Sequence, residues 1–227
     1  MSTLYLIATP IGNRDDFSYR AVEVLDSADV VACEDTRTSS KLFNYYKIDK
    51  PVFSFHQHNE HKKVDGLIER LNMGQTVALI TDAGTPGISD PGFLASRAAH
   101  QAGHSVSAIP GPDAATTALV ASGLPADKFI FDGFLPHKKG RQTQIRNYMD
   151  EERTVILFES PYRIKKLLKE LTEQMDDGRW IAVCRELTKK FEEVIRGTLR
   201  EVAEKIESVD KPKGEFVIVI AGCHYEE

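Results

Sequence analysis

At 227 residues, the chain is long enough to form one large domain or two modest ones. Apolar residues make up 41% of it and charged residues 28%, proportions typical of soluble globular proteins. The net charge of −5 at pH 7 excludes a global basic field, so a nucleic-acid partner would need local basic patches. No apolar run reaches the roughly 18 residues of a membrane span, and the N-terminus has no secretory pattern. These features predict a cytoplasmic protein with no membrane partner.

The three cysteines support the same compartment. Cys33, Cys184 and Cys223 are few, odd in number and widely spaced, with no C-x-x-C pair. Such usage favours a reducing compartment and argues against a structural zinc site.

Expected strands and helices alternate along the first half of the chain, which predicts βαβ units and a mostly parallel sheet. Short apolar runs mark the strands, and helix caps and formers mark the helices, such as Ser18 at the start of the first one. The strands are expected at residues 4–8, 29–33, 52–55, 76–80 and 106–109, and the helices at residues 18–28, 39–46, 61–72, 93–102 and 114–121.

An unusual polar cluster follows each of these five strands. Ligands of open parallel sheets bind outside the carboxyl ends of the strands. Five clusters at one edge therefore indicate a binding site rather than five unrelated turns. The clusters are T-P-I-G-N at residues 9–13, E-D-T-R at 34–37, H-Q-H-N-E at 56–60, T-D-A-G-T-P-G at 81–87 and P-G-P-D at 110–113.

The longest of these loops, residues 81–92, reads T-D-A-G-T-P-G-I-S-D-P-G. Its three glycines permit backbone conformations that a Cβ would forbid, and its two prolines stiffen it by fixing φ. A loop of this kind suits a backbone that wraps a small molecule, although a turn-rich connection without a ligand is the alternative. Neither a G-x-x-x-x-G-K-[ST] nor a G-x-G-x-x-G motif occurs, which disfavours a P-loop nucleoside triphosphatase and an ordinary Rossmann dehydrogenase.

Two of the clusters carry candidate catalytic residues. Asp35 and His58 could each accept a substrate proton, and Arg37 could hold a phosphate. The alternatives are structural: Asp35 or Thr36 as a helix N-cap, and His58 as a hydrogen-bonding loop residue. A metal site built on the histidines is disfavoured, because no second cluster of ligands is evident.

The turn S-G-L-P at residues 122–125 is the expected domain boundary, which predicts an N-terminal α/β domain at 1–122 and a C-terminal α/β domain at 126–225. The second domain is expected to have a mixed sheet. Its strands are expected at residues 129–134, 154–158, 180–184 and 216–221, and its helices at 142–149, 164–174 and 198–206, with a further segment at 193–196.

Three basic runs lie in the second half of the chain, although the net charge of the whole chain is negative. Any one of them could be a solvated helix face, but together they favour a local surface that binds phosphates. The runs are Lys138, Lys139, Arg141 and Arg146; Arg163, Lys165 and Lys166; and Lys189 with Lys190.

Ten short motifs, in this order, resemble one family. The chain is similar to the small-subunit ribosomal RNA methyltransferases that modify a cytidine ribose 2′-O, within the tetrapyrrole methylase superfamily. The resemblance runs from about Leu4 to Gly222. It rests on A-T-P-I-G-N, R-A-x-E-x-L, E-D-T-R, F-H-x-H-N-E, the loop of residues 81–92, P-G-P-D-A, G-F-L-P, F-E-S-P-Y-R, C-R-E-L-T-K and K-G-E-F-V.

The resemblance implies an S-adenosylmethionine-dependent enzyme of two α/β domains, with the cofactor in the cleft between them, and a homodimer. The implied substrate is cytidine 1402 of the decoding centre, in 16S rRNA of the small ribosomal subunit, with no DNA partner. No metal is implied. The implied cofactor-binding residues are Pro10, Asp82, Ala83, Gly84, Pro86, Ile88, Thr116, Thr117, Phe158, Leu187 and Glu215.

One departure separates this chain from the members that methylate tetrapyrrole carbons. Those members resemble G-x-G-x-G-D at the end of the first strand, whereas residues 8–13 here read A-T-P-I-G-N, with one glycine. This favours the RNA branch. A tetrapyrrole C-methyltransferase and a non-catalytic ribosome-binding module remain the alternatives.

Overall fold

The protein, seen here as a computed structural model that describes residues 2–227, divides into two α/β units. The first unit ends at Asp113 and the second is Ala114–Glu227. The first sheet is entirely parallel and the second is mixed, which confirms the expected fold class. Within residues 2–227, no helix has both the length and the apolar character needed to cross a membrane.

The first unit contains five parallel strands in the order β3-β2-β4-β1-β5. All eight residues of β2 and β4 are buried, because helices cover both faces of the sheet. The strands are β1 (Thr3–Ile7), β2 (Val30–Cys33), β3 (Val52–Ser54), β4 (Val77–Ile80) and β5 (Ser105–Ile109), and the helices are η1 (Arg14–Asp16), α1 (Tyr19–Ser27), α2 (Thr36–Tyr46), α3 (Glu60–Asn72) and α4 (Phe93–Gln101).

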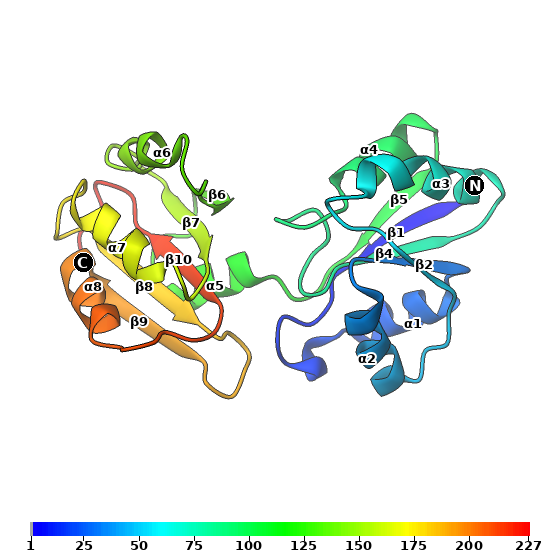
Figure 1. Ribbon diagram of the computed structural model, residues 1–227, viewed down its shortest axis with the longest axis horizontal. Coiled ribbons are helices and arrows are strands. Elements are labelled where there is room, and N and C mark those ends of the chain that lie inside the picture. The colour runs from blue at the N-terminus through cyan, green and yellow to red at the C-terminus, as the bar shows by residue number, and fades with distance from the viewer. Residues whose placement is uncertain (1) are drawn as a thin grey trace. The chain divides into compact units, whose positions relative to one another are not determined.

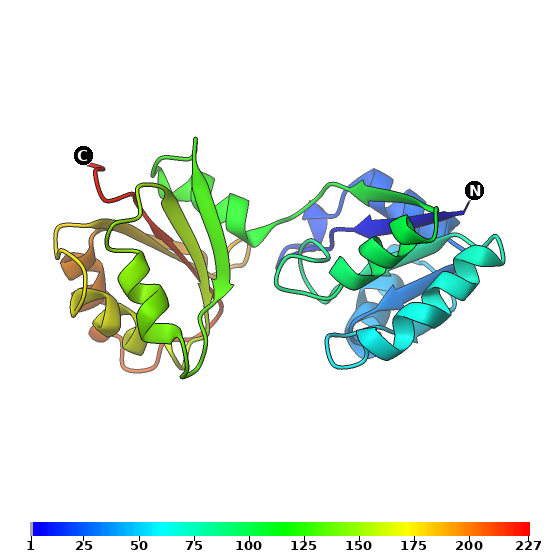
Figure 2. The ribbon, with the colours of Figure 1, turned by 90° about the horizontal axis from the view of Figure 1, so that it is seen from above.

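Helices α1 and α2 cover one face of this sheet, and α3 and α4 cover the other (Figures 1 and 2). Two separate cores result. One contains Leu25 and Phe43 from α1 and α2, and the other contains Leu67 and Ala95 from α3 and α4. The arrangement follows from right-handed crossovers, since the chain moves one way across the sheet from β1 to β3 and the other way from β3 to β5.

This topology gives the end of β4 a special position. The connections after β1 and β2 lead to one face of the sheet, and those after β3 and β4 lead to the other. Strand β4 lies between β2 and β1, so its loop is flanked on both sides by loops that diverge from it. Diverging loops at the carboxyl edge open a crevice where α/β proteins bind ligands. The loop at this point of the sheet is residues 81–92.

The second sheet has the order β6-β7-β10-β8-β9, with β6 and β7 parallel and β10 antiparallel to both of its neighbours. Its larger core lies under α6, α7 and α8, which contribute Ile145, Leu167 and Val202. The strands are β6 (Phe129–Phe134), β7 (Thr154–Glu159), β8 (Trp180–Arg185), β9 (Glu193–Thr198) and β10 (Phe216–Ile220), and the helices are α5 (Ala114–Ser122), α6 (Arg141–Asn147), α7 (Ile164–Thr172) and α8 (Leu199–Glu207).

Helix α5 belongs to the second unit, which differs from the boundary expected after Ser122. The Cys184 thiol lies 3.8 Å from the carbonyl oxygen of Ala118, and Arg196 Nε donates to the carbonyl of Ser122 at 2.9 Å. Helix α5 carries apolar residues around its whole circumference, so the sequence alone does not indicate which sheet it covers.

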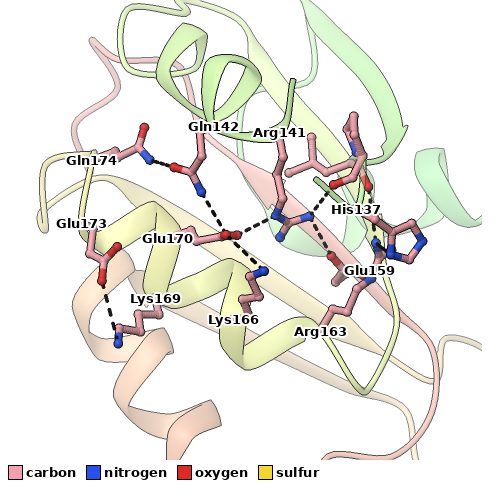
Figure 3. A network of polar contacts seen from close by, with 12 residues as sticks. His137, Arg141, Gln142, Glu159, Arg163, Lys166, Lys169, Glu170, Glu173 and Gln174 are labelled. Carbon is pink, nitrogen blue, oxygen red and sulfur yellow. Dashed lines mark hydrogen bonds and ion pairs between the residues drawn. The ribbon is translucent and has the colours of Figure 1, made fainter. Parts of the chain in front are cut away.

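A buried ionic network lies within the second unit (Figure 3). Arg141 is 3% exposed, and its Nε donates to Glu170 at 2.7 Å while its Nη1 lies 3.7 Å from Glu159. Arg163 pairs with the other oxygen of Glu159 at 2.7 Å. Arg141, a member of the first basic run, is thus an internal counter-ion rather than a surface cation.

We expect Arg141→Ala to destabilise the protein by about 3 to 5 kcal/mol, because it leaves the buried Glu159 and Glu170 carboxylates short of a counter-ion. Chemical denaturation at neutral pH measures the change. Arg37→Ala is the control, since Arg37 pairs with Asp35 but its side chain is 88% exposed, and little change is expected there. Equal destabilisation by the two variants would contradict this account.

Candidate cofactor and substrate site

The loop after β4 is tied to the end of β1 by paired backbone hydrogen bonds. Thr9 N–H donates to the Gly84 carbonyl at 2.9 Å, and Gly84 N–H donates to the Thr9 carbonyl at 3.0 Å. The Thr9 hydroxyl also donates to the Thr81 carbonyl at 3.0 Å. Gly84 has φ +81°, which L side chains rarely adopt. Position 84 therefore requires glycine for its backbone conformation. Pro10 directly follows Thr9 in the chain, so it lies next to this pairing.

Two more glycines allow close packing around the same loop. A Cβ on Gly92, which has φ +143°, would lie 2.9 Å from the Gly87 nitrogen. A Cβ on Gly111 would lie 3.1 Å from the Cβ of Ala8, at the end of β1. The Thr85 hydroxyl donates to the Pro112 carbonyl at 3.3 Å. The clusters that follow β1, β4 and β5 are therefore in contact.

The remaining two clusters contact the same loop. Asp35 N–H donates to Asp82 Oδ1 at 3.2 Å, and Asp82 N–H donates to Glu34 Oε2 at 3.4 Å. Gln57 Nε2, after β3, donates to the Ser89 carbonyl at 2.9 Å. All five polar clusters thus meet at the carboxyl edge of the first sheet, as the strand-end pattern predicts.

Asp35 has a structural role that the sequence left open. It is the N-cap of α2, and its carboxylate accepts from the Arg37 backbone N–H at 2.8 Å and from the Arg37 guanidinium at 2.7 Å. The hydrogen bonds from Arg37 lower the pKa of Asp35 to about 2. A carboxylate stabilised in this way is a weak proton acceptor at neutral pH. Helix α2 accordingly begins at Thr36, before the expected Ser39.

Asp90 is a site residue that sequence reasoning missed. It is half-buried in the loop, and burial together with the negative charges of Glu34 and Asp82 raises its pKa to about 7. Burial also raises the pKa of Glu34 and of Asp82. The preceding residue, Ser89, has φ +62°, a strained conformation for a non-glycine residue. The sequence feature that could have pointed to Asp90 is that it is the second aspartate, after Asp82, in the loop of residues 81–92.

His58 is exposed on the loop between β3 and α3. Its ring centroid lies 6.0 Å from that of His56, and the His56 backbone N–H donates to the Asn59 side chain at 2.8 Å. Within residues 2–227, no three His, Cys, Asp or Glu side chains gather in a way that could hold a metal ion. His58 is thus available to a ligand from solvent.

In the second unit, the five expected site residues gather at one end of the sheet. Phe158 pairs with Val217 across β7 and β10, and the Glu186 N–H donates to the Glu215 carbonyl at 3.0 Å, which places the turn containing Leu187 beside the start of β10. The N-terminal turn of α5 lies at this end because α5 runs opposite to β8. That turn carries Thr116 and Thr117.

Leu187 and Glu215 differ in accessibility. Leu187 is 6% exposed, whereas the Glu215 side chain is 77% exposed and pairs with Lys189 at 2.8 Å. Phe158 is half-buried and contacts two further rings, with centroid distances of 5.0 Å to Phe131 and 5.6 Å to Phe134. This end of the sheet therefore offers an aromatic surface beside charged groups.

Comparison with known proteins identifies the family. The profile of the family described as Tetrapyrrole (Corrin/Porphyrin) Methylases matches residues 3–203. The chain belongs to the tetrapyrrole methylases. It is 44% identical to ribosomal RNA small subunit methyltransferase I of Haemophilus influenzae, over 96% of this chain and 78% of that protein. It is 48% identical to the protein of the same name from Mesorhizobium japonicum, over 96% of this chain and 74% of that protein. The family resemblance and the expected enzyme class are thereby confirmed.

Solved structures of tetrapyrrole methylases share the fold. Diphthine synthase has a TM-score of 0.74 at 16% identity, covering 97% of this chain and 90% of its own. Uroporphyrin-III-C-methyltransferase from Thermus thermophilus has a TM-score of 0.64 at 20% identity, covering 98% and 95%. At such low identity the likeness concerns the fold alone.

Proposed function

We propose that the protein transfers a methyl group from S-adenosylmethionine to the ribose 2′-hydroxyl of a decoding-centre cytidine, cytidine 1402, in 16S rRNA of the small ribosomal subunit. The observation that carries the proposal is the identity of more than 40% over nearly the whole chain to proteins named ribosomal RNA small subunit methyltransferase I. The single glycine in residues 8–13 favours RNA over a tetrapyrrole as the substrate. A tetrapyrrole C-methyltransferase is the second candidate, since that chemistry occurs on the same fold.

The residues of the first unit suit this cofactor. When bound, S-adenosylmethionine supplies a methyl group on a positively charged sulfur. The carboxylates of Glu34, Asp82 and Asp90 provide negative charge at the carboxyl edge of the sheet. Backbone groups around Gly84 and the side chains of Pro86 and Ile88 would hold the cofactor there, with Pro10 and Ala83 beside them. Ile88 is 37% exposed, so its apolar surface is available to a ligand.

The residues of the second unit would complete the cofactor site. Phe158 and Leu187 offer apolar contacts of the kind an adenine ring needs. Thr116, Thr117 and Glu215 offer hydroxyl and carboxylate groups for polar contacts. Both units would then contribute residues that bind the cofactor, and a homodimer is part of the same proposal.

The main task of such an enzyme is to align the ribose oxygen with the methyl group. A 2′-hydroxyl is a poor nucleophile and gains from a nearby proton acceptor. Among the carboxylates of the edge, Asp90 is the best matched to this role, because its pKa of about 7 lies near working pH. Asp35 is held in its ion pair with Arg37, and His58 remains the alternative acceptor. Arg37, with an exposed side chain, could contact a phosphate of the substrate.

We expect Gly84→Val to weaken S-adenosylmethionine binding by at least about tenfold, because a β-branched residue is strained at φ +81° and would disturb the pairing with Thr9. Titration calorimetry on the folded variant measures the affinity. Gly66→Val, at an exposed helical position where a Cβ meets nothing within 4 Å, is the matched control. Wild-type affinity in the Gly84 variant would remove the loop backbone from the cofactor site.

We expect the logarithm of the single-turnover rate to rise with pH and reach a plateau, with a midpoint near 7, because Asp90 accepts a proton only when ionised. Asp90→Asn should lower the rate about 10²- to 10⁴-fold while cofactor affinity changes little. Asp35→Asn and His58→Ala should each lower it less than about tenfold. If Asp90→Asn keeps the wild-type single-turnover rate and His58→Ala loses most of it, the proton acceptor is His58 and not Asp90.

The substrate is tested with radiolabelled S-adenosylmethionine. We expect methyl transfer to assembled or partly assembled small subunits to exceed transfer to a short free oligonucleotide by more than about tenfold, because recognition should rest on the shape and phosphates of a folded RNA site. Equal rates on both substrates would contradict that expectation. No transfer to either, with a coloured product from a tetrapyrrole, would favour the second candidate.

A further inference from the structure

Two neighbouring turns of the second unit form an exposed surface. They are residues 135–140, after β6, and residues 160–163, after β7. The two strands are parallel, with Phe134 paired to Phe158, so both turns leave the same edge of the sheet. Arg163 Nη1 joins them, since it lies 3.4 Å from the Leu135 carbonyl and 3.4 Å from His137 Nδ1 (Figure 3).

The two turns present an aromatic ring and two cations to solvent. Tyr162 is 95% exposed, although tyrosine usually buries much of its ring. Lys138 and Lys139 are both exposed. Within residues 2–227, none of these three side chains has a hydrogen bond, ion pair or ring contact. We call Lys138, Lys139 and Tyr162 the Tyr162 platform.

Most cations of the other basic runs pair with carboxylates of the same unit. Lys165 pairs with Glu207 at 3.8 Å, and Lys189 pairs with Glu186 and Glu215. Arg141 is buried against Glu170. The adjacent exposed lysines Lys138 and Lys139 therefore keep positive charge that an anionic ligand can reach, whereas Lys190, which also lacks a carboxylate partner in the described part of the chain, lies over the Phe191 ring with its Nζ 5.7 Å from the centroid.

The buried network holds these turns in place. Glu159 accepts from the Ser160 backbone N–H at 2.8 Å and pairs with Arg163, while Arg141 Nη1 contacts the Pro136 carbonyl at 3.4 Å. Both turns are thus anchored to buried charges at the edge of the sheet. A surface fixed in this way binds a ligand with less loss of conformational entropy than mobile loops would.

We propose that the Tyr162 platform binds single-stranded RNA, with one base stacked on the Tyr162 ring and the neighbouring phosphates at Lys138 and Lys139. An exposed aromatic ring beside unpaired cations is the combination that single-stranded nucleic acid requires. An overall charge of −5 would otherwise repel RNA, so contacts must come from such a local patch. The inference rests on the proposed function, and it specifies which of the basic runs contacts the substrate.

Binding of a fluorescein-labelled single-stranded oligoribonucleotide, measured by anisotropy over a range of salt concentrations, tests the platform. Tyr162→Ala should weaken binding about 5- to 100-fold with an unchanged salt dependence, because it removes stacking but no charge. Tyr162→Phe should stay within about twofold of the wild type. The Lys138→Ala/Lys139→Ala double variant should reduce the slope of log K against log salt by about 1.4, from two lost phosphate contacts.

Matched controls lie elsewhere on the surface. Tyr19→Ala removes a ring that is 92% exposed in the first unit, and Lys169→Ala/Lys205→Ala removes two exposed charges that pair with Glu173 and Glu193. Both controls should change affinity less than about twofold. Wild-type affinity in Tyr162→Ala, or an equal loss in platform and control variants, would overturn the inference.

Methyl transfer to small subunits separates this inference from the proposed function. If the wild type is active and the platform variants are equally active at limiting substrate, the inference that the Tyr162 platform binds RNA is contradicted, but the proposed function is not. An inactive wild type would contradict the proposed function, whatever the oligonucleotide binding shows. If the lysine variant weakens binding to heparin and RNA equally while Tyr162→Ala affects neither, the surface is a general polyanion site and the inference fails.

Discussion

The candidate site depends on the reciprocal backbone hydrogen bonds between Thr9 and Gly84. They form an antiparallel bridge just beyond the parallel pairing of β1 and β4, and so fix the loop of residues 81–92 at the point where neighbouring loops diverge. The other clusters reach this loop through hydrogen bonds that involve side chains, from Asp35 to Asp82, from Gln57 to Ser89 and from Thr85 to Pro112. Loss of the Thr9–Gly84 pairing would therefore affect all five clusters.

The distribution of charge gives the two units different roles in the proposed reaction. Carboxylates concentrate at the carboxyl edge of the first sheet, where burial raises the pKa of Glu34, Asp82 and Asp90, and the charges of Glu34 and Asp82 raise that of Asp90 further. Such an edge attracts a cationic sulfur and repels phosphates. The anionic RNA backbone must then be held by cations elsewhere, and Lys138 and Lys139 in the second unit are suited to that task. The acidic net charge is compatible with an RNA substrate on these terms.

Strand and helix positions, the parallel first sheet and the gathering of polar clusters were predictable from the sequence, because apolar period and turn residues determine them locally. Three features were not. The packing of α5 depends on which sheet covers a helix that is apolar all round, the high pKa of Asp90 depends on carboxylates more than 50 positions earlier or on a neighbouring strand end, and the burial of Arg141 depends on Glu159 and Glu170 from other elements. Each arises from tertiary contacts that no local pattern records.

The position of the transferred methyl group tests the central claim most directly. Small subunits that lack the modification are incubated with the protein and S-adenosylmethionine, and the digested nucleosides are analysed by mass spectrometry. The account predicts one methylated nucleoside, a cytidine whose added mass stays with the ribose when the base is cleaved off. A methyl group on the base, or on a nucleoside other than cytidine, would contradict it.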